Sequence, residues 1–229
     1  MRNKISYTPD LVILDSDYRY GGGMQKFTQE QVKAEPMFFS ASCKHAYEHG
    51  GPITKNFMHA LGTLSPYFQE GIFDSRTHML MPSWYPCIPG WHVDDVPRTR
   101  SDGQPDHINP AYKAQHCMAW VGDEPNAPTE FLRGRFELFD VPIGSTKKSI
   151  YGIWNTEIDM MVERSMYFPH RTQGNTLIYF DWQSFHRGTP ANGNGWRWFG
   201  RVSINTNRKV MNELRTQVQV YMPCHTAGW

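Results

Sequence analysis

The feature that most constrains the fold is a series of short apolar runs that fills the chain from Arg76 onward. The runs have the length and the β-branched or aromatic content of strands, and Gly, Pro or Asn residues separate them. A series of this kind is typical of a sandwich or a jelly-roll barrel. The predicted strands cover residues 77–81, 88–93, 114–121, 130–141, 149–154, 176–180, 196–206 and 216–222.

Two of these runs alternate as a strand with one buried face does. Across residues 132–138 the even-numbered positions are Leu, Gly, Phe and Leu, and the odd-numbered positions are Arg, Arg and Glu. Across residues 217–222 three apolar side chains alternate with Gln, Gln and Tyr. We therefore predict a mainly β fold.

The first third of the chain is predicted to be helical and irregular, and to pack against the sheet. Thr28 and Gln31 have the spacing of a capping box, which predicts a short helix that the following proline stops. Thr54 is predicted to cap a helix over residues 55–61, which Gly62 would end.

Length and charge indicate a single domain with no strong electrostatic attraction to nucleic acid or membrane. A chain of 229 residues suits a single domain, with residues 1–75 as support and residues 76–222 as the β core. The 23 basic and 22 acidic residues nearly cancel, which indicates no nucleic-acid partner and no membrane partner.

The Gly21-Gly22-Gly23 triplet lacks the Lys-Ser/Thr of a phosphate loop, so we interpret it as a flexible turn.

The four cysteines are Cys43, Cys87, Cys117 and Cys224. They form no C-x-x-C pair and no dense disulfide spacing, so we interpret them as structural thiols in a reducing compartment. No apolar run has the length of a membrane helix, and no secretory signal is visible. We therefore expect a cytoplasmic protein.

The chemistry is predicted to lie at Gly90-Trp91-His92-Val93-Asp94. On a strand, His92 and Asp94 would project to the same face, and the distant His186 could supply a third ligand. Two histidines and one carboxylate on one side of a metal form the facial site of non-haem Fe(II) oxygenases, which leaves the opposite positions open. We predict His92, Asp94 and His186 as metal ligands.

This ordered set resembles the Fe(II)/2-oxoglutarate-dependent oxygenases over about residues 76–206. The family places H-x-D, a distal His and a downstream Arg on a double-stranded β-helix, a jelly-roll core on which the N-terminal helices would pack here. The resemblance implies Fe(II) bound by His92, Asp94 and His186, with 2-oxoglutarate as cosubstrate. It further implies that O2 and 2-oxoglutarate are consumed to give succinate and carbon dioxide while a small molecule or side chain is hydroxylated.

Two arginines compete for the cosubstrate carboxylate. Arg197 and Arg201 share one face of the predicted strand over residues 196–206. If residues 192–195 form a hairpin tip, Arg201 lies beside His186 and Arg197 lies about 13 Å away, at about 3.3 Å per residue. Arg201-Val202-Ser203 also matches an R-x-S pattern of the family, so Arg201 and Ser203 are favoured and Arg197 is the alternative.

Three other interpretations are open. His45-Ala46-Tyr47-Glu48-His49 matches the inverted zinc-peptidase motif, but Gly50 and Gly51 would end its helix at once. A cupin-type metalloenzyme usually has two histidines where this chain has His92 and Asp94. A non-enzymatic carbohydrate- or ligand-binding module would use exposed aromatics as platforms: Trp84, Tyr85, Trp91, Trp182, Trp196 and Trp198.

Residues 96–112 form the longest unpatterned segment of the β region. They follow the metal motif directly, and three prolines keep them out of a regular strand. We predict that this segment covers the active site, with Arg98 and Arg100 available to an anionic part of a substrate. His107, His116 and His170 have no partner in the sequence pattern and are interpreted as structural.

Overall fold

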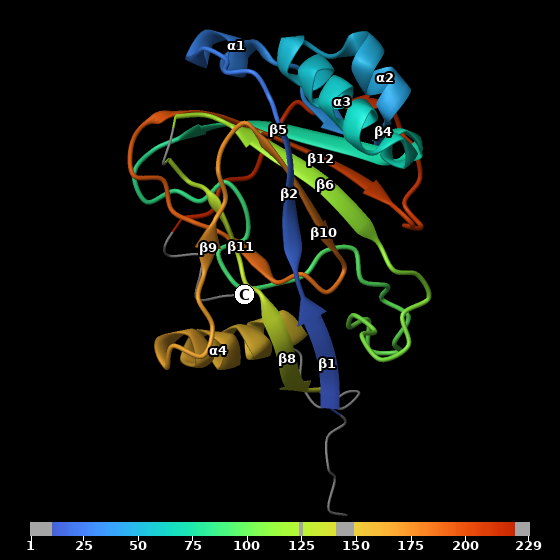
Figure 1. Cartoon of the computed structure of the whole chain (residues 1–229), viewed down its shortest axis with the longest axis vertical. Helices are drawn as coiled ribbons and strands as arrows, with labels where there is room; N and C mark the ends of the chain where they lie inside the picture. The colour runs from blue at the N-terminus through green and yellow to red at the C-terminus, as the bar shows by residue number, and fades with distance from the viewer. Residues whose placement is uncertain (1–10, 124–125, 141–148, 223–229) are drawn as a thin grey trace, which may run out of the picture.

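A computed structural model describes residues 11–123, 126–140 and 149–222. The described part is mainly β, and every paired strand is antiparallel. Its principal sheet has six strands in the order β2-β10-β6-β12-β5-β4 (Figure 1). These strands are β2 (Tyr18–Gly23), β4 (Ala41–Ser42), β5 (Ile72–Leu80), β6 (Gln115–Val121), β10 (Thr176–Asp181) and β12 (Gly195–Ile204).

A three-stranded sheet, in the order β11-β7-β9, packs against the inner face of the principal sheet. It contains β7 (Thr129–Phe131), β9 (His170–Arg171) and β11 (His186–Gly188). Phe131 of this small sheet joins Met118, Ile178 and Phe180 of the principal sheet in one buried cluster. A single bridge between His92 and His186 continues the small sheet on its other edge. Chain segments that are far apart in sequence therefore meet between the two sheets.

Three helices cover the outer face of the principal sheet (Figure 1). They are α1 (Gln29–Ala34), α2 (Cys43–His49) and α3 (Pro52–Leu64), followed by the 3-10 turn η1 (Pro66–Glu70). Apolar residues of α3, such as Phe57 and Leu61, are fully buried with Trp198 and Val202 of β12. Because side chains alternate along a strand, residues 197, 199, 201 and 203 of β12 face the small sheet instead.

A second core lies under helix α4 (Ile150–Glu163), at the end of the molecule opposite to α1–α3 (Figure 1). The ribbon of β1 (Leu11–Ser16) and β8 (Gly134–Phe139) packs beside this helix. Fully buried Trp91 and Trp154 belong to the same cluster. The remaining pair is β3 (Phe38–Phe39) with β13 (Glu213–Leu214). It joins the C-terminal part of the described chain to the segment between α1 and α2.

Several predicted elements are confirmed, with shifted ends. Runs 77–81, 114–121, 176–180 and 196–206 correspond to β5, β6, β10 and β12. The alternation across residues 132–138 is confirmed in β8, where Phe136 and Leu138 are buried and Arg135 and Glu137 are exposed. The Thr28 capping box is also confirmed, because Thr28 Oγ1 accepts from the Gln31 amide and Gln31 Oε1 accepts from the Thr28 amide.

Other predicted strands are wrong. Residues 149–154 begin α4, in which buried Ile150, Trp154 and Ile158 recur at helical spacing beyond the short window that resembles a strand. Residues 88–93 hold only the His92 bridge, and residues 216–222 only the bridge of Tyr221 to Tyr85.

The predicted strand 130–141 divides into β7 and β8, which belong to different sheets, and Val141 lies outside the described residues. The break falls at Gly134, the first residue of β8. Its φ of +135° is a conformation that residues other than glycine rarely adopt, and a Cβ added at this position would lie 2.6 Å from the Tyr167 ring. The second strand thus begins where the chain turns into the other layer.

The expected support layer also differs in detail. β1 and β2 make residues 11–23 part of two sheets, and Gly21-Gly22-Gly23 lies in β2 rather than in a turn. A Cβ on Gly21 would lie 2.5 Å from the Tyr179 ring, so glycine permits close approach of β10. Thr54 does not cap a helix, because α3 starts at Pro52 and runs through Gly62.

The start of α3 is capped from another segment. The Glu35 carboxylate accepts from the Ile53 and Thr54 amides at 3.1 and 2.9 Å. An acidic group at a helix N-terminus is stabilising, because it satisfies amides that have no partner inside the helix.

Two further predictions concern membrane helices and thiols. Among the residues described, no helix is both long and apolar enough to cross a bilayer. Cys43, Cys87 and Cys117 carry free thiols, and Cys224 lies outside the described residues.

His107 is buried in the second core. Its ring centroid lies 4.8 Å from that of Trp154, and its Nε2 lies 3.3 Å from the Tyr151 hydroxyl. Burial lowers the pKa of His107 to about 3, so the folded chain keeps this ring neutral in mild acid.

We expect this histidine to make the free energy of unfolding depend on pH. In the unfolded chain a histidine titrates near pH 6.5, so below that pH the unfolded state binds a proton that the folded state does not. The contribution is fully present above about pH 6.5 and is lost toward pH 3, with a slope approaching about 1.4 kcal/mol per pH unit. Urea unfolding of a His107→Gln variant should show a weaker pH dependence than the parent. The exposed His59→Gln change is the control, and equal pH dependence of parent and His107→Gln would contradict the assignment.

Candidate metal centre

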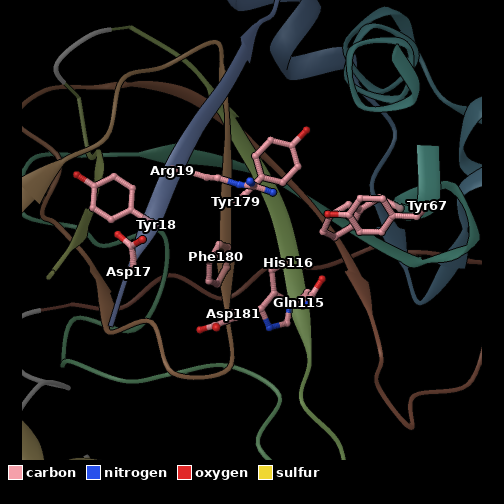
Figure 2. A pocket seen from close by; sticks show the side chains of 10 residues that line it. Asp17, Tyr18, Arg19, Tyr67, Gln115, His116, Tyr179, Phe180 and Asp181 are labelled. Atoms are coloured by element: carbon pink, nitrogen blue, oxygen red, sulfur yellow. The ribbon is translucent and has the colours of Figure 1, made fainter. Parts of the chain in front are cut away.

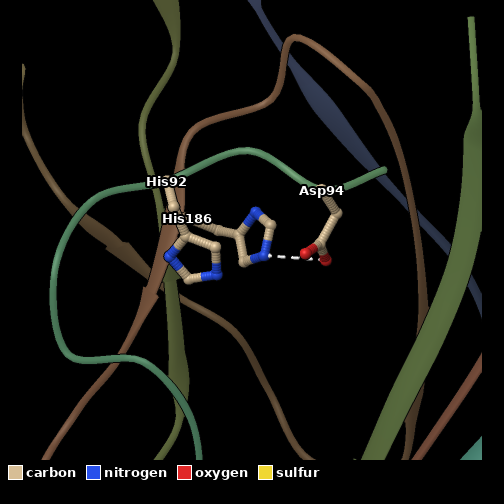
Figure 3. A group of neighbouring side chains, drawn as sticks. All are labelled: His92, Asp94 and His186. Atoms are coloured by element: carbon tan, nitrogen blue, oxygen red, sulfur yellow. Dashed lines mark ion pairs between the residues drawn. The ribbon is translucent and has the colours of Figure 1, made fainter. Parts of the chain in front are cut away.

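Three side chains meet in the space between the two sheets. One ligand atom each from His92, Asp94 and His186 lies within 4.8 Å of the others, and the two histidines are buried. Figure 3 shows the two rings and the carboxylate converging, with an ion pair between His186 and Asp94. The set contains the donor types of a two-histidine, one-carboxylate metal site.

His92 and His186 are held by a reciprocal pair of backbone hydrogen bonds. The His92 amide donates to the His186 carbonyl at 3.1 Å, and the His186 amide donates to the His92 carbonyl at 3.0 Å. This exchange fixes the two backbones at the distance of neighbouring strands although residues 88–93 form no strand. Asp94 lies in a bend just beyond the bridge, and the αL conformation of Asp95, with φ of 51°, follows it.

Both imidazoles are oriented by backbone carbonyls. His92 Nδ1 lies 2.8 Å from the Gly90 carbonyl, and His186 Nδ1 lies 3.0 Å from the Ser184 carbonyl. Since a carbonyl can only accept, each Nδ1 is the protonated nitrogen, so Nε2 carries the lone pair with which an imidazole binds a metal. This is the orientation that metal-binding histidines adopt in proteins.

The geometry between His186 and Asp94 fits a cation. His186 Nε2 lies 3.2 Å from Asp94 Oδ2, so a ring nitrogen whose partner nitrogen is already protonated faces a carboxylate oxygen. Two lone pairs at this distance repel each other unless a proton or a metal ion lies between them. The residues present therefore fit a divalent metal.

Burial and neighbouring charges set the pKa values of His92 and Asp94. Burial lowers the pKa of His92 to about 4, and the neighbouring His186 adds to the effect, so His92 is neutral at physiological pH. Burial opposes ionisation of Asp94, but the charge of Arg201 outweighs it and holds the pKa of Asp94 well below its usual value. Both groups are in the protonation state that a metal requires.

Helix α4 positions the segment that carries His92. Asn155 Oδ1 accepts from the Trp91 amide at 2.7 Å, and Asp159 Oδ1 accepts from the Trp91 indole at 3.0 Å. Arg187, next to His186, lies over the Trp91 ring at 4.2 Å and pairs with Asp159 at 3.2 Å. No sequence signal points to these supporting residues, because the first part of this helix resembles a strand.

Glu130 braces the other side of His186. Its buried carboxylate pairs with Arg187 at 2.9 Å and with Arg171 at 3.1 Å. Phe131, the next residue on β7, stacks on the His186 ring at 5.2 Å between centroids. The ring is therefore fixed by its backbone, by its neighbour on the chain and by an aromatic partner.

A cavity of about 280 Å³ runs from the three ligands into the space between the sheets. Arg197 and Arg201 both line it. Arg201 pairs with Asp94 and lies 4.0 Å from Asp95, so its guanidinium stands at the level of the ligands. Arg197 lies four residues further along the same face of β12.

Arg197 is buried without a carboxylate partner among the described residues. It is 2% exposed, it donates a hydrogen bond to Thr129 Oγ1 at 3.3 Å, and its Nε has no acceptor within the described part of the chain. Burial lowers the pKa of Arg197 to about 10, so it stays charged at neutral pH. A buried charge without a counterion is costly, which marks this end of the cavity as a place for an anion.

His78 lies beside Arg197 across the β5–β12 pair. It is 1% exposed, and neither ring nitrogen makes a hydrogen bond of normal geometry to a described residue, although the Gln219 backbone lies near the ring. Burial lowers the pKa of His78 to about 3, and Arg197 and Arg76 act in the same direction. A neutral imidazole here has one N–H to donate to an anion bound by Arg197.

The predicted hairpin between His186 and Arg201 is wrong. β12 pairs with β5 and β6, whereas β11 pairs with β7, so the two strands belong to opposite sheets. Arg201 nevertheless reaches the ligands, across the space between the sheets. Ser203 does not line the cavity, because its buried hydroxyl is bonded to His116 Nδ1 at 2.9 Å.

A second cavity of about 760 Å³ also contains His92 and Asp94 in its wall. Residues 96–112 contribute much of the remaining wall, so this segment lines the same cavity as two of the three ligands. The Arg100 side chain is largely buried and paired with Asp102 at 3.0 Å and with Asp140 at 2.6 Å, whereas Arg98 lines the cavity and makes no ion pair among the described residues. The ion pairs of Arg100 thus hold the segment in place as part of the cavity wall, and Arg98 is the arginine that lines the cavity.

A shallower cavity of about 220 Å³ lies beside β2, β6 and β10 (Figure 2). Its charged side chains have structural partners: Asp17 pairs with Arg133, Arg19 lies over the Tyr179 ring, and Asp181 accepts from the Gln183 amide. It contains none of the three ligands. We therefore assign no chemistry to it.

The rival motifs find little support in the described residues. His45 and His49 stack at 4.1 Å, but the one cluster of potential metal ligands in the described residues is that of His92, Asp94 and His186. His116 is buried, and His170 is exposed and pairs with Phe131 in the small sheet. None of the proposed aromatic platforms is exposed; Trp91, Trp182 and Trp198 are buried, and Trp84, Tyr85 and Trp196 are partly buried.

No protein-family model matches the chain, and no curated protein matches it. Among solved structures, the chain is similar to the apo form of ThoJ, described as a non-heme monooxygenase, with 11% sequence identity and a TM-score of 0.35. The similarity covers 83% of this chain and 74% of that one. At this level of similarity the likeness identifies neither fold nor activity, so the function must be inferred from the geometry of the site itself.

We expect metal binding to require all three ligands. Replacing His92, Asp94 or His186 by Ala removes one of three donors, so each variant should lose most of its affinity for Fe(II) in anaerobic titrations. His45→Ala and His49→Ala are matched controls and should bind Fe(II) as the parent does. The reverse pattern would move the metal to the H-x-x-E-H motif.

Proposed function

We propose that the protein is an Fe(II)- and 2-oxoglutarate-dependent oxygenase that hydroxylates a small molecule or a side chain. The observation that carries the proposal is the convergence of two histidines, each with Nδ1 turned to a backbone carbonyl, and one ionised carboxylate between two cavities. Three ligands on one side of Fe(II) leave coordination positions for a cosubstrate and O2, which is the arrangement that such oxygenases use.

We further propose that the core is a single double-stranded β-helix domain. The strand order β5-β12-β6-β10 faces the order His92-β11-β7-β9, which gives two four-membered layers. Chain neighbours alternate between these layers except β7 and β9, which pair with each other. This alternation supports a jelly roll, whose closed layers place ligands from distant segments at one point.

For the cosubstrate we propose Arg197 as the partner of the far carboxylate, in place of the Arg201 that the R-x-S pattern favours. The 2-oxo acid end of 2-oxoglutarate would lie at the metal, so the far carboxylate needs a cation deeper in the cavity. Arg201 stands at the ligands themselves and is paired with Asp94. Arg197 is displaced along β12 by about 13 Å of strand, at about 3.3 Å per residue, and has no carboxylate partner among the described residues.

When bound, Fe(II) with 2-oxoglutarate supplies the activation of O2 and the oxidation of the substrate. The residues of the chain bind, orient and shield. Arg197 and Thr129 would hold the carboxylate, with His78 as an additional donor. Phe131 and Phe180, whose rings lie 5.2 and 5.1 Å from that of His186, keep the ligand sphere apolar and limit access of water.

We expect Arg197→Gln to weaken 2-oxoglutarate binding by about a hundredfold or more, because losing one partner of a buried charge pair costs about 3–5 kcal/mol. The measurement is an anaerobic titration of the Fe(II)-loaded protein, followed by the visible charge-transfer band of the complex and by calorimetry. The control is Arg133→Gln, at a half-exposed arginine that pairs with Asp17 away from both cavities.

Two outcomes would change the assignment. If Arg201→Gln abolishes 2-oxoglutarate binding with iron retained while Arg197→Gln does not, the carboxylate partner is Arg201. If neither the parent nor any variant binds 2-oxoglutarate, a metalloenzyme of another type, such as a cupin, replaces the proposal.

A further inference from the structure

The two cavities that contain the ligands carry a local charge unlike that of the whole chain. Six guanidinium groups line them, from Arg76, Arg98, Arg197, Arg201, Arg208 and Arg215. Three carboxylates face these groups, from Asp74, Asp94 and Asp95. The described lining thus has an excess of three positive charges, in a chain whose formal net charge is +1.

The ion pairs show where the excess lies. Asp74 pairs with Arg208 at 2.5 Å and with Arg215 at 3.2 Å, and Asp94 and Asp95 face Arg201. Arg76, Arg98 and Arg197 make no ion pair within the described part of the chain.

Iron and cosubstrate do not remove the excess. Fe(II) brings two positive charges, and the 2-oxoglutarate dianion brings two negative ones. Counted over both cavities, the lining therefore keeps three positive charges after both have bound; Arg76 and Arg197 line only the smaller cavity, and Arg98 lines only the larger one. A cleft that keeps one sign of charge concentrates ligands of the opposite sign.

The larger cavity has the wall of a small-molecule site. Its volume of about 760 Å³ is within the range of such sites. Tyr112 and Tyr151 line it together with apolar residues of the 96–112 segment, and Arg98 and Arg208 are its cations. Arg208 also lines the smaller cavity, so it stands where the two cavities meet at His92 and Asp94.

We propose, on the basis of the proposed function, that the substrate is a small organic anion with an apolar or aromatic body. Its body packs in the larger cavity against Tyr112 and Tyr151, and its carboxylate or phosphate group is met by Arg98 and Arg208. The same arrangement disfavours cationic molecules of equal size, because an ammonium group in the larger cavity would face the guanidinium of Arg98, which makes no ion pair among the described residues.

The test compares probes that share a phenyl body and differ in charge: phenylacetate, phenyl phosphate, phenethyl alcohol and phenethylamine. Protein loaded with Mn(II) and saturated with 2-oxoglutarate is titrated, and broadening of the phenyl proton NMR signals by Mn(II) reports binding near the ligands. At least one of the two anions should bind at least tenfold more tightly than the alcohol and the amine. Comparing phenylacetate with phenyl phosphate tells which anionic group the site prefers.

Arg98→Gln is the informative variant, because Arg98 is exposed and its guanidinium donates to the Gly103 carbonyl within the same loop, so the fold does not depend on it. It should weaken binding of the preferred anion at least threefold and leave phenethyl alcohol unchanged. Arg133→Gln is the matched control and should change neither.

The outcomes separate this inference from the proposed function. If 2-oxoglutarate and Mn(II) bind but phenethylamine or the alcohol binds as tightly as both anions, the inference is wrong and the function stands. Anion binding that disappears when 2-oxoglutarate saturates the protein also overturns it, because the anion then occupies the smaller cavity. If Mn(II) causes no broadening, saturation-transfer NMR without metal still measures the anion preference. Anion preference with loss in Arg98→Gln would then support the inference while the oxygenase assignment fails.

Discussion

The site depends on one backbone contact, the reciprocal hydrogen bonds between His92 and His186. These two bonds join a segment without regular structure to the short strand β11, and they set the spacing of two of the three ligands. The contact is supported from outside, because Trp91 is held by Asn155 and Asp159 of α4 while Arg187 covers its ring. Rigid supports of this kind give a metal site its geometry before the metal arrives.

Charge burial is the second constraint. The chain places several guanidinium groups between two sheets, where each costs free energy unless a carboxylate or a ligand pairs with it. Asp74 and Asp94 offset part of that cost, but among the described residues Arg197 has the Thr129 hydroxyl and the Trp120 ring as partners and no carboxylate. Structures keep such unpaired groups mainly where a ligand completes them, which is why Arg197 carries more weight in the proposal than its place in the sequence suggests.

The order of His92, Asp94 and His186 is visible in the sequence because their chemistry needs specific residue types, and the structure brings them together. The main strands of the large sheet are also predictable, since β-branched and aromatic runs report local preference.

The pairing of strands is not predictable from local sequence, because it depends on packing across the whole core. The expected hairpin places β12 beside the wrong strand. Arg197 is named from the sequence only as the alternative to Arg201, and the role proposed for His78 has no local signal, because the burial and the missing partners that favour both residues appear only in the structure. The start of α4 is predicted wrongly because six residues of mixed β-branched and aromatic character do not distinguish a strand from the first turns of a helix.

The pinned segment over the larger cavity affects the thermodynamics of recognition. Arg100 is locked to Asp102 and Asp140, and Asp106 donates its amide to the Pro97 carbonyl, so the wall is ordered without a ligand. Ordering a loose loop costs about 1–2 kcal/mol per residue in backbone entropy. Here that entropy is lost during folding, so a molecule entering the cavity binds to a surface already in shape, and its affinity reflects contacts and charge more than the ordering of the loop.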